Sequence, residues 1–82
     1  PETAFEQEMS SLVAAFQEIS KRFSPRAVET VYQVIHAPGN ALLSNEILPA
    51  AEAAEQGASS QELSDMAASG LFGGGPVPEL KM

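Results

Sequence analysis

The sequence predicts a small all-α domain, and three observations carry that prediction. Apolar residues recur at helical spacing through the first quarter of the chain, Ser/Thr-x-x-Glu motifs stand where two helices would begin, and Gly or Pro follows the periodic segments. The expected architecture is a helical hairpin, about residues 3–23 and 25–37, two short helices, about 49–56 and 60–69, and an extended Gly/Pro C-terminal tail. Residues 1–70 should form one domain, and residues 71–82 a tail bound to a partner.

The first helix has the clearest sequence pattern. Thr3 and Glu6 form a capping box, in which each side chain accepts a hydrogen bond from an otherwise unpaired backbone N–H. Apolar residues then alternate at spacings of four and three, which is the a/d pattern of packed helices. They are Phe5, Met9, Leu12, Phe16, Ile19 and Phe23. A stripe this long predicts burial against another helix or a partner.

The second helix is predicted to begin at Ser24-Pro25, since serine is a favoured N-cap and proline is favoured at the first helical position. Pro38-Gly39 should end it. Its apolar face is expected to consist of Val28, Val31, Tyr32 and Ile35, with Val34 beside that face. The many β-branched residues leave a strand as the competing interpretation, but the spacing and the cap favour a helix. The short junction predicts an antiparallel hairpin or a sharply bent pair.

The second half of the chain has shorter periodic segments. Pro49 fits the first position of an alanine-rich helix that has little to bury, and Gly57 should terminate it. Ser59 and Glu62 form a second capping box, and Gly70 should end the helix that this box begins. The residues expected to face inward on this last helix are Leu63, Met66 and Ala67.

The C-terminal tail combines chain-breaking residues with apolar ones. Three consecutive glycines, Gly73 to Gly75, and the segment Pro76-Val77-Pro78 disfavour a helix and favour an extended chain. A simple spacer would not need large apolar side chains, yet the tail carries Leu71, Phe72, Val77, Leu80 and Met82. We therefore expect a partner to hold it.

Composition narrows the classes of function. Eleven acidic residues against four basic ones give a formal net charge of −7 over 82 residues, which argues against direct nucleic-acid binding. The sequence has no cysteine and no long apolar run, so we expect neither disulfides nor a membrane span. The first residues do not resemble a signal peptide. We expect a cytoplasmic origin, and a virion is also compatible with this composition.

No arrangement of residues predicts catalysis, a cofactor or a metal site. His36 is the only histidine, and its position near the end of the second helix suits a cation that interacts with the helix dipole. The pairs Glu52/Glu55 and Glu62/Asp65 are spaced to share a helix surface and are expected to face water. The basic residues Lys21, Arg22 and Arg26 are expected to balance charge at the end of the first helix, with docking of an acidic partner surface as the alternative.

The leading hypothesis is a non-enzymatic structural or assembly protein, a small acidic helical subunit that packs onto a larger complex, for example as a phage virion component or an accessory subunit. Its partner is another protein or a second copy of the chain. The residues expected to make these contacts are Phe5, Met9, Leu12, Phe16, Leu71, Phe72, Val77 and Leu80.

Two alternatives belong to other classes. An acidic regulatory or inhibitory protein could occupy the basic surface of a partner, and its binding would then depend on salt and on Glu46, Glu52, Glu55, Glu62 and Asp65. The stretch from Glu62 to Met66, followed by Gly73-Gly74, is also similar to the leader helix and double-glycine cleavage site of ribosomal-peptide precursors. The segment after those glycines lacks Cys, Ser and Thr, the residues that are modified in such products.

Overall fold

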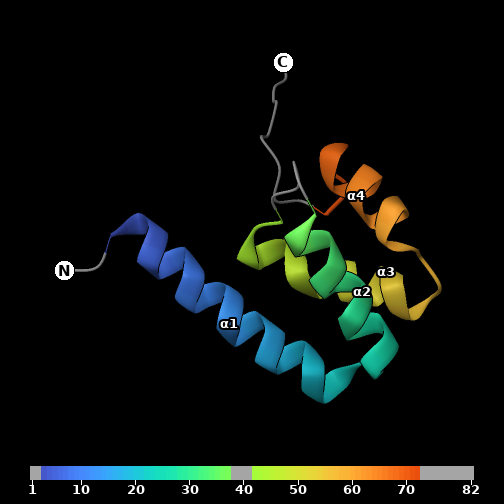
Figure 1. The fold of residues 1–82 in the computed structure, drawn as a ribbon, viewed down its shortest axis with the longest axis horizontal. Coiled ribbons are helices and arrows are strands. Elements are labelled where there is room, and N and C mark those ends of the chain that lie inside the picture. Colours follow the sequence, from blue (N-terminus) through green and yellow to red (C-terminus); the bar gives the residue numbers. More distant parts are fainter. Residues whose placement is uncertain (1–2, 38–41, 73–82) are drawn as a thin grey trace.

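The computed structural model describes residues 3–37 and 42–72, and within these ranges its regular structure is entirely helical. Helix α1 spans Ala4–Arg22, α2 spans Pro25–His36, α3 spans Ile47–Glu55 and α4 spans Ser60–Ala68. A short 3-10 helix, Ser44–Glu46, leads directly into α3. The predicted all-α class is confirmed (Figure 1).

The helix ends follow the predicted capping chemistry. The Glu6 N–H donates to Thr3 Oγ1 at 3.1 Å, and the Thr3 N–H donates to Glu6 Oε1 at 3.0 Å, which completes the first capping box. The Ser59 and Glu62 pair forms the second box in the same way. Gly57, just after α3, has a φ of 113°, a conformation that costs glycine little because it lacks a Cβ. Local sequence therefore determined where these helices begin and end.

Helix α3 is the centre of the domain and packs against α1, α2 and α4. Its residues Ala50, Ala51 and Ala54 are fully buried. Because these alanine side chains are small, neighbouring helices can approach α3 closely and cover it on several sides. The expectation that this helix has little to bury was wrong. Ile47 of α3 is buried as well, and the remaining buried apolar residues of the described core lie around this helix: Ile19, Ala27, Val31, Val34, Leu42, Leu63 and Phe72.

Helix α3 also begins earlier than the sequence predicted. It starts at Ile47, so Pro49 is its third residue and not its first. This position costs no backbone hydrogen bond, because the first four N–H groups of a helix have no partner within it. The 3-10 helix delivers Ile47 into the core, where its side chain is fully buried.

Helix α2 is rotated relative to the predicted apolar face. The buried residues are Ala27, Val31 and Val34, whereas Tyr32 is about half exposed. Alanine and valine fit against the small residues of α3, with which α2 makes its main packing contact. Tyr32, placed on the inward face by spacing alone, lies instead on the side of α2 toward α1, where it forms an edge-to-face pair with Phe16.

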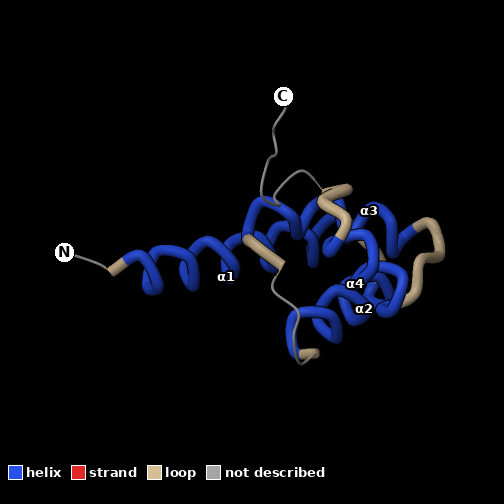
Figure 2. Tube along the Cα trace, turned by 90° about the horizontal axis from the view of Figure 1, so that it is seen from above, coloured by secondary structure: helices blue, strands red, loops and turns tan. Residues whose placement is uncertain are grey.

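Helix α1 extends away from the rest of the domain at its N-terminal end (Figures 1 and 2). Its only fully buried residue is Ile19, near its C-terminal end. Helices α1 and α2 diverge from the corner at Ser24, so they are a sharply bent pair, and α3 packs against both. None of the described helices is both long and apolar enough to cross a membrane.

Candidate functional site

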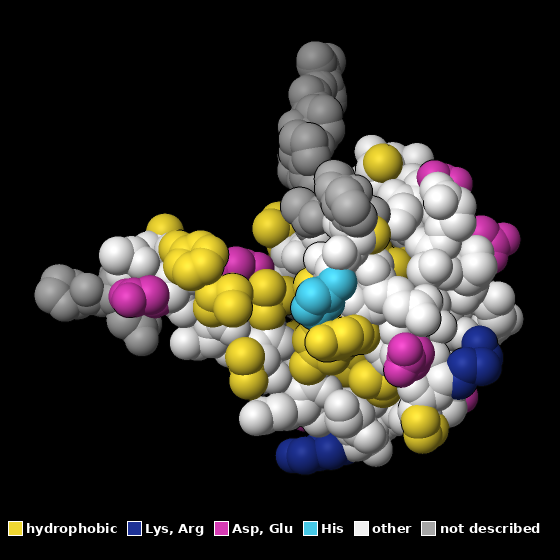
Figure 3. Space-filling view, in the orientation of Figure 1, with side chains coloured by type: hydrophobic (Ala, Val, Ile, Leu, Met, Phe, Trp, Pro, Cys, Tyr) yellow, Lys and Arg dark blue, Asp and Glu magenta, His cyan; other side chains and the backbone are white. Residues whose placement is uncertain are grey.

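The best candidate site is an apolar groove between α1 and α2, with a volume of about 410 Å³. We call it the α1–α2 groove. Its walls are Met9, Leu12, Val13, Phe16, Gln17 and Ser20 of α1, together with Tyr32 and His36 of α2. Figure 3 shows the hydrophobic side chains continuing from the projecting part of α1 to the surface beside the histidine.

A second hollow continues the α1–α2 groove toward the corner between the helices. It has a volume of about 520 Å³, and Ser20 and Tyr32 line both hollows. Phe23, Pro25, Val28 and Glu29 complete its lining. The two hollows thus adjoin each other at Tyr32 of α2 and at a small residue, Ser20, of α1.

Aromatic rings form the α2 wall of the groove. The rings of Phe16 and Tyr32 pack nearly perpendicular, with centroids 6.2 Å apart. The rings of Tyr32 and His36 are 4.1 Å apart, and His36 Nδ1 lies 3.1 Å from the Tyr32 carbonyl oxygen. Such a wall offers large apolar contact area with few rotatable bonds, a property typical of protein-binding surfaces.

The apolar surface continues beyond the groove along the projecting half of α1. Phe5 is 73 % exposed, Met9 46 % and Val13 54 %. We call these three residues the outer stripe. Phe5 and Met9 belong to the predicted interaction set, and the structure leaves both accessible. Val13 was not in that set, although its place four residues after Met9 on a helix could have indicated it.

The other predicted interaction residues have different positions. Leu12 and Phe16 are partly buried and pack on the core, with Phe16 also lining the groove. Leu71 is exposed. Phe72 is buried in the core, so its side chain stabilises this domain and is not offered to a partner, which corrects its assignment to the tail. Val77 and Leu80 lie outside the described residues.

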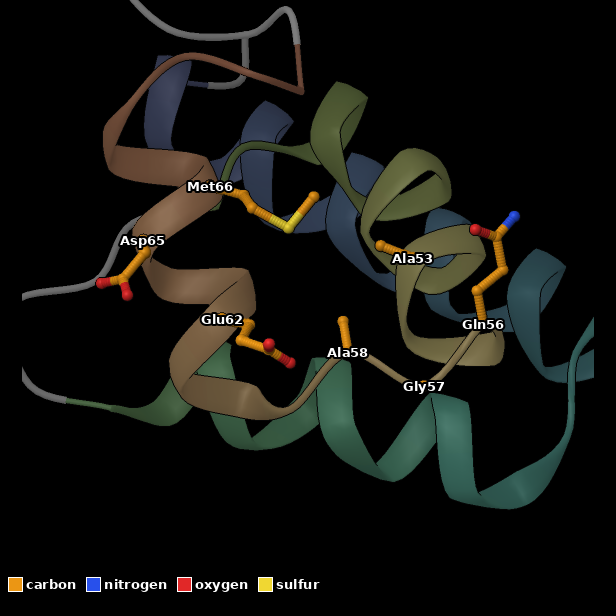
Figure 4. Close-up of a pocket in the computed structure, with 7 residues that line it drawn as sticks. All are labelled: Ala53, Gln56, Gly57, Ala58, Glu62, Asp65 and Met66. Atoms are coloured by element: carbon orange, nitrogen blue, oxygen red, sulfur yellow. The ribbon is translucent and has the colours of Figure 1, made fainter.

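A further hollow of about 550 Å³ lies between α3 and α4 (Figure 4). Its lining includes the carboxylates of Glu62 and Asp65, both on exposed residues of α4. Each accepts a local hydrogen bond, Glu62 from the Ser59 N–H and Asp65 from the Gln61 side-chain amide. In the described part of the chain, no group of three or more His, Cys, Asp or Glu residues could hold a metal ion. The two carboxylates of this hollow therefore do not belong to such a metal-binding group.

Two carboxylates join segments that are distant in sequence, and sequence patterns did not indicate either. Glu8 of α1 accepts from the Ser44 N–H at 2.7 Å, so it caps the 3-10 helix from outside. Glu55 of α3 accepts from the Ser24 N–H at 3.0 Å and from the Ser24 hydroxyl at 2.9 Å. These bonds from Ser24, backbone first and then hydroxyl, hold the pKa of Glu55 below its ordinary value of 4.5.

Several charged residues considered as binding residues also have internal roles. Glu46 is only 3 % exposed, and its carboxylate accepts from the Leu43 N–H at 2.7 Å. Arg26 donates to the Ala54 carbonyl oxygen at 3.4 Å, and Arg22 forms an ion pair with Glu18 at 3.6 Å. These contacts support a structural role for much of the charge near the Ser24 corner.

Comparisons with known proteins find no significant match: no family model matches the sequence, no curated protein matches it, and no solved structure matches the fold. The functional argument therefore depends on the surface of the molecule itself.

Proposed function

We propose that this protein is a non-enzymatic structural or assembly subunit that docks on a larger complex through the outer stripe and the α1–α2 groove. The observation that carries the proposal is the exposure of Phe5, Met9 and Val13 on a helix that projects from the domain. Contiguous apolar surface beside an aromatic groove costs free energy in water, and burial against a partner recovers it.

The exposed stripe is better explained by docking on a partner than by packing within this domain. If α1 served only the core of this domain, its large side chains would be concentrated near Ile19, where α3 covers them. Instead the a/d pattern continues to Phe5, well beyond that cover. A phage virion component or an accessory enzyme subunit are two kinds of assembly that would use such a helix.

The acidic-inhibitor alternative has less support. Of the five carboxylates that would contact a basic partner, Glu46 is buried and Glu55 is bonded to Ser24. Glu62 takes part in a capping box. Of the five carboxylates, this leaves Glu52 and Asp65 on exposed residues.

The proposal is tested by the size of the complex that contains the protein in an extract of its native source. We expect the wild-type chain to elute with a larger assembly and the variant Met9→Glu to elute free, because a charge in the outer stripe cannot be buried without cost. Ala14→Glu is the matched control, since the exposed Ala14 is turned about 140° around α1 from Met9. Elution of the wild-type chain at its free mass, or equal loss in both variants, would contradict the proposal.

A further inference from the structure

We infer that the occupant of the α1–α2 groove is α1 of a second copy of this chain, packed antiparallel across a twofold axis near Leu12 and Val13. This inference rests on the proposed function, because it names the first partner that the outer stripe contacts. Two features of α1 support it: the position of its exposed apolar side chains and the position of its small residue.

The apolar features of α1 are self-complementary. When Leu12 of one copy is placed opposite Val13 of the other, Met9 lies opposite Phe16 and Phe5 lies opposite Ser20. Phe5 is the most exposed large apolar side chain of the described residues, and Ser20 is the small residue at which the two hollows join. A phenylalanine ring would therefore enter the place where the two hollows adjoin, beside Tyr32. Each surface is used twice, as a closed twofold dimer requires.

The projecting half of α1 has room for this arrangement. Because the N-terminal end of α1 extends away from the domain, it can lie along the C-terminal half of a partner helix, beside that partner's α2 (Figures 1 and 3). A parallel pair would bring the two Phe5 residues together and leave both grooves beside Ser20 open. Only the antiparallel arrangement fills the groove with the stripe.

Single-cysteine variants of the full chain test this arrangement, since the native sequence contains no cysteine. In sedimentation equilibrium, the apparent molecular mass of the purified wild-type protein should double as the protein concentration rises from about 1 µM to about 1 mM. Under mild oxidation Val13→Cys should form a disulfide-linked dimer, because the two copies of residue 13 lie one residue apart along the pair. Phe5→Cys should not, because its two copies are about 22 Å apart along the helices. An equimolar mixture of Phe5→Cys and Ser20→Cys should give the mixed dimer.

The control is Ala14→Cys, an exposed residue on the far side of α1 that should remain uncrosslinked. A wild-type protein that stays monomeric over the whole concentration range would overturn the dimer and leave the groove to another protein or to another segment of this chain. Efficient crosslinking of Phe5→Cys with itself, or of Ala14→Cys, would overturn antiparallel pairing. If the purified protein is a monomer but elutes in a large complex from its native source, the dimer is disproved and the proposed assembly function stands. If the protein is a dimer that never enters a larger complex, only the assembly function is disproved.

Discussion

The two ends of α1 carry the same apolar repeat but have opposite environments. At the C-terminal end Ile19 is fully buried and α3 packs against the helix. At the N-terminal end Phe5, Met9 and Val13 are exposed, and the helix projects beyond the domain. The difference shows that a periodic stripe predicts a surface that needs burial, but whether that burial occurs within the chain depends on how far the neighbouring helices reach.

Polar contacts follow the same division. The Ser24 corner is fixed by hydrogen bonds to Glu55 and by Arg26, which reaches the Ala54 carbonyl. The N-terminal half of α1 is joined to the domain through Glu8, which holds Ser44. One end of the helix is therefore anchored by core packing and several polar contacts, and the other by a carboxylate bridge and the partly buried Leu12.

The largest expected effect comes from exchanging a buried residue for alanine at the anchored end. Ile19→Ala should lower the free energy of unfolding by about 2–5 kcal/mol, because it removes a filled volume from the core. Phe5→Ala, at the projecting end, should change it by less than about 0.5 kcal/mol. Urea denaturation monitored by circular dichroism, at a concentration where the protein is monomeric, measures both. Similar losses of unfolding free energy in the two variants would show that both ends of α1 contribute equally to the stability of the domain.

The next effect concerns the carboxylate bridge of the projecting half. Glu8→Ala should lower the free energy of unfolding by about 1 kcal/mol, because the Ser44 N–H loses a charged acceptor in a partly buried setting. Amide hydrogen exchange should increase over the first half of α1 and over the 3-10 helix, with α4 unchanged. The control Glu18→Ala removes a carboxylate from an exposed ion pair and should leave that exchange pattern as it is.

A smaller, pH-dependent effect is expected at the anchored end. The pKa of Glu55 is lower in the folded chain than its ordinary value of 4.5, so its contribution is complete above that value and is lost as the pH falls through the folded pKa. Glu55→Gln should therefore be less stable than wild type at pH 7, and the difference should shrink below about pH 4.5. Denaturation of the two proteins across this pH range is the measurement. A difference that is constant with pH would disprove the role of the ionised carboxylate.

The smallest effect should follow loss of the cap at the projecting end. Thr3→Ala removes the acceptor of the Glu6 N–H and should cost about 0.5 kcal/mol, the low end for N-caps, since the first turn is exposed and frays. Circular dichroism should show a slight loss of helix. Thr3→Ser, which keeps a hydroxyl acceptor, should behave as wild type, and an equal loss in both variants would contradict the capping role.

Much of the fold could be predicted because helix boundaries depend on neighbouring residues. The Thr3/Glu6 and Ser59/Glu62 boxes, the Ser24 cap and Gly57 all act over three or four residues, and each occurs where predicted. The inward face of α4 was also correct, with Leu63 fully buried and Met66 packed against the core. Of the candidate site, Phe5 and Met9 are exposed, and their use as interaction residues stays a prediction.

The sequence alone determined the helical class, the capping of the main helices and the apolar stripe of α1. Only the tertiary structure decided that α3 is central, that Phe72 belongs to the core, that Tyr32 faces the groove, and that Glu8 and Glu55 accept hydrogen bonds from distant segments of the chain. The physical reason is the distance along the chain between the residues that interact. Caps and periodicity arise from contacts within a few residues, whereas burial and carboxylate bridges depend on which distant helix comes close. At Phe5 no described helix comes close enough to cover the side chain, and there the surface of this protein is left for a partner.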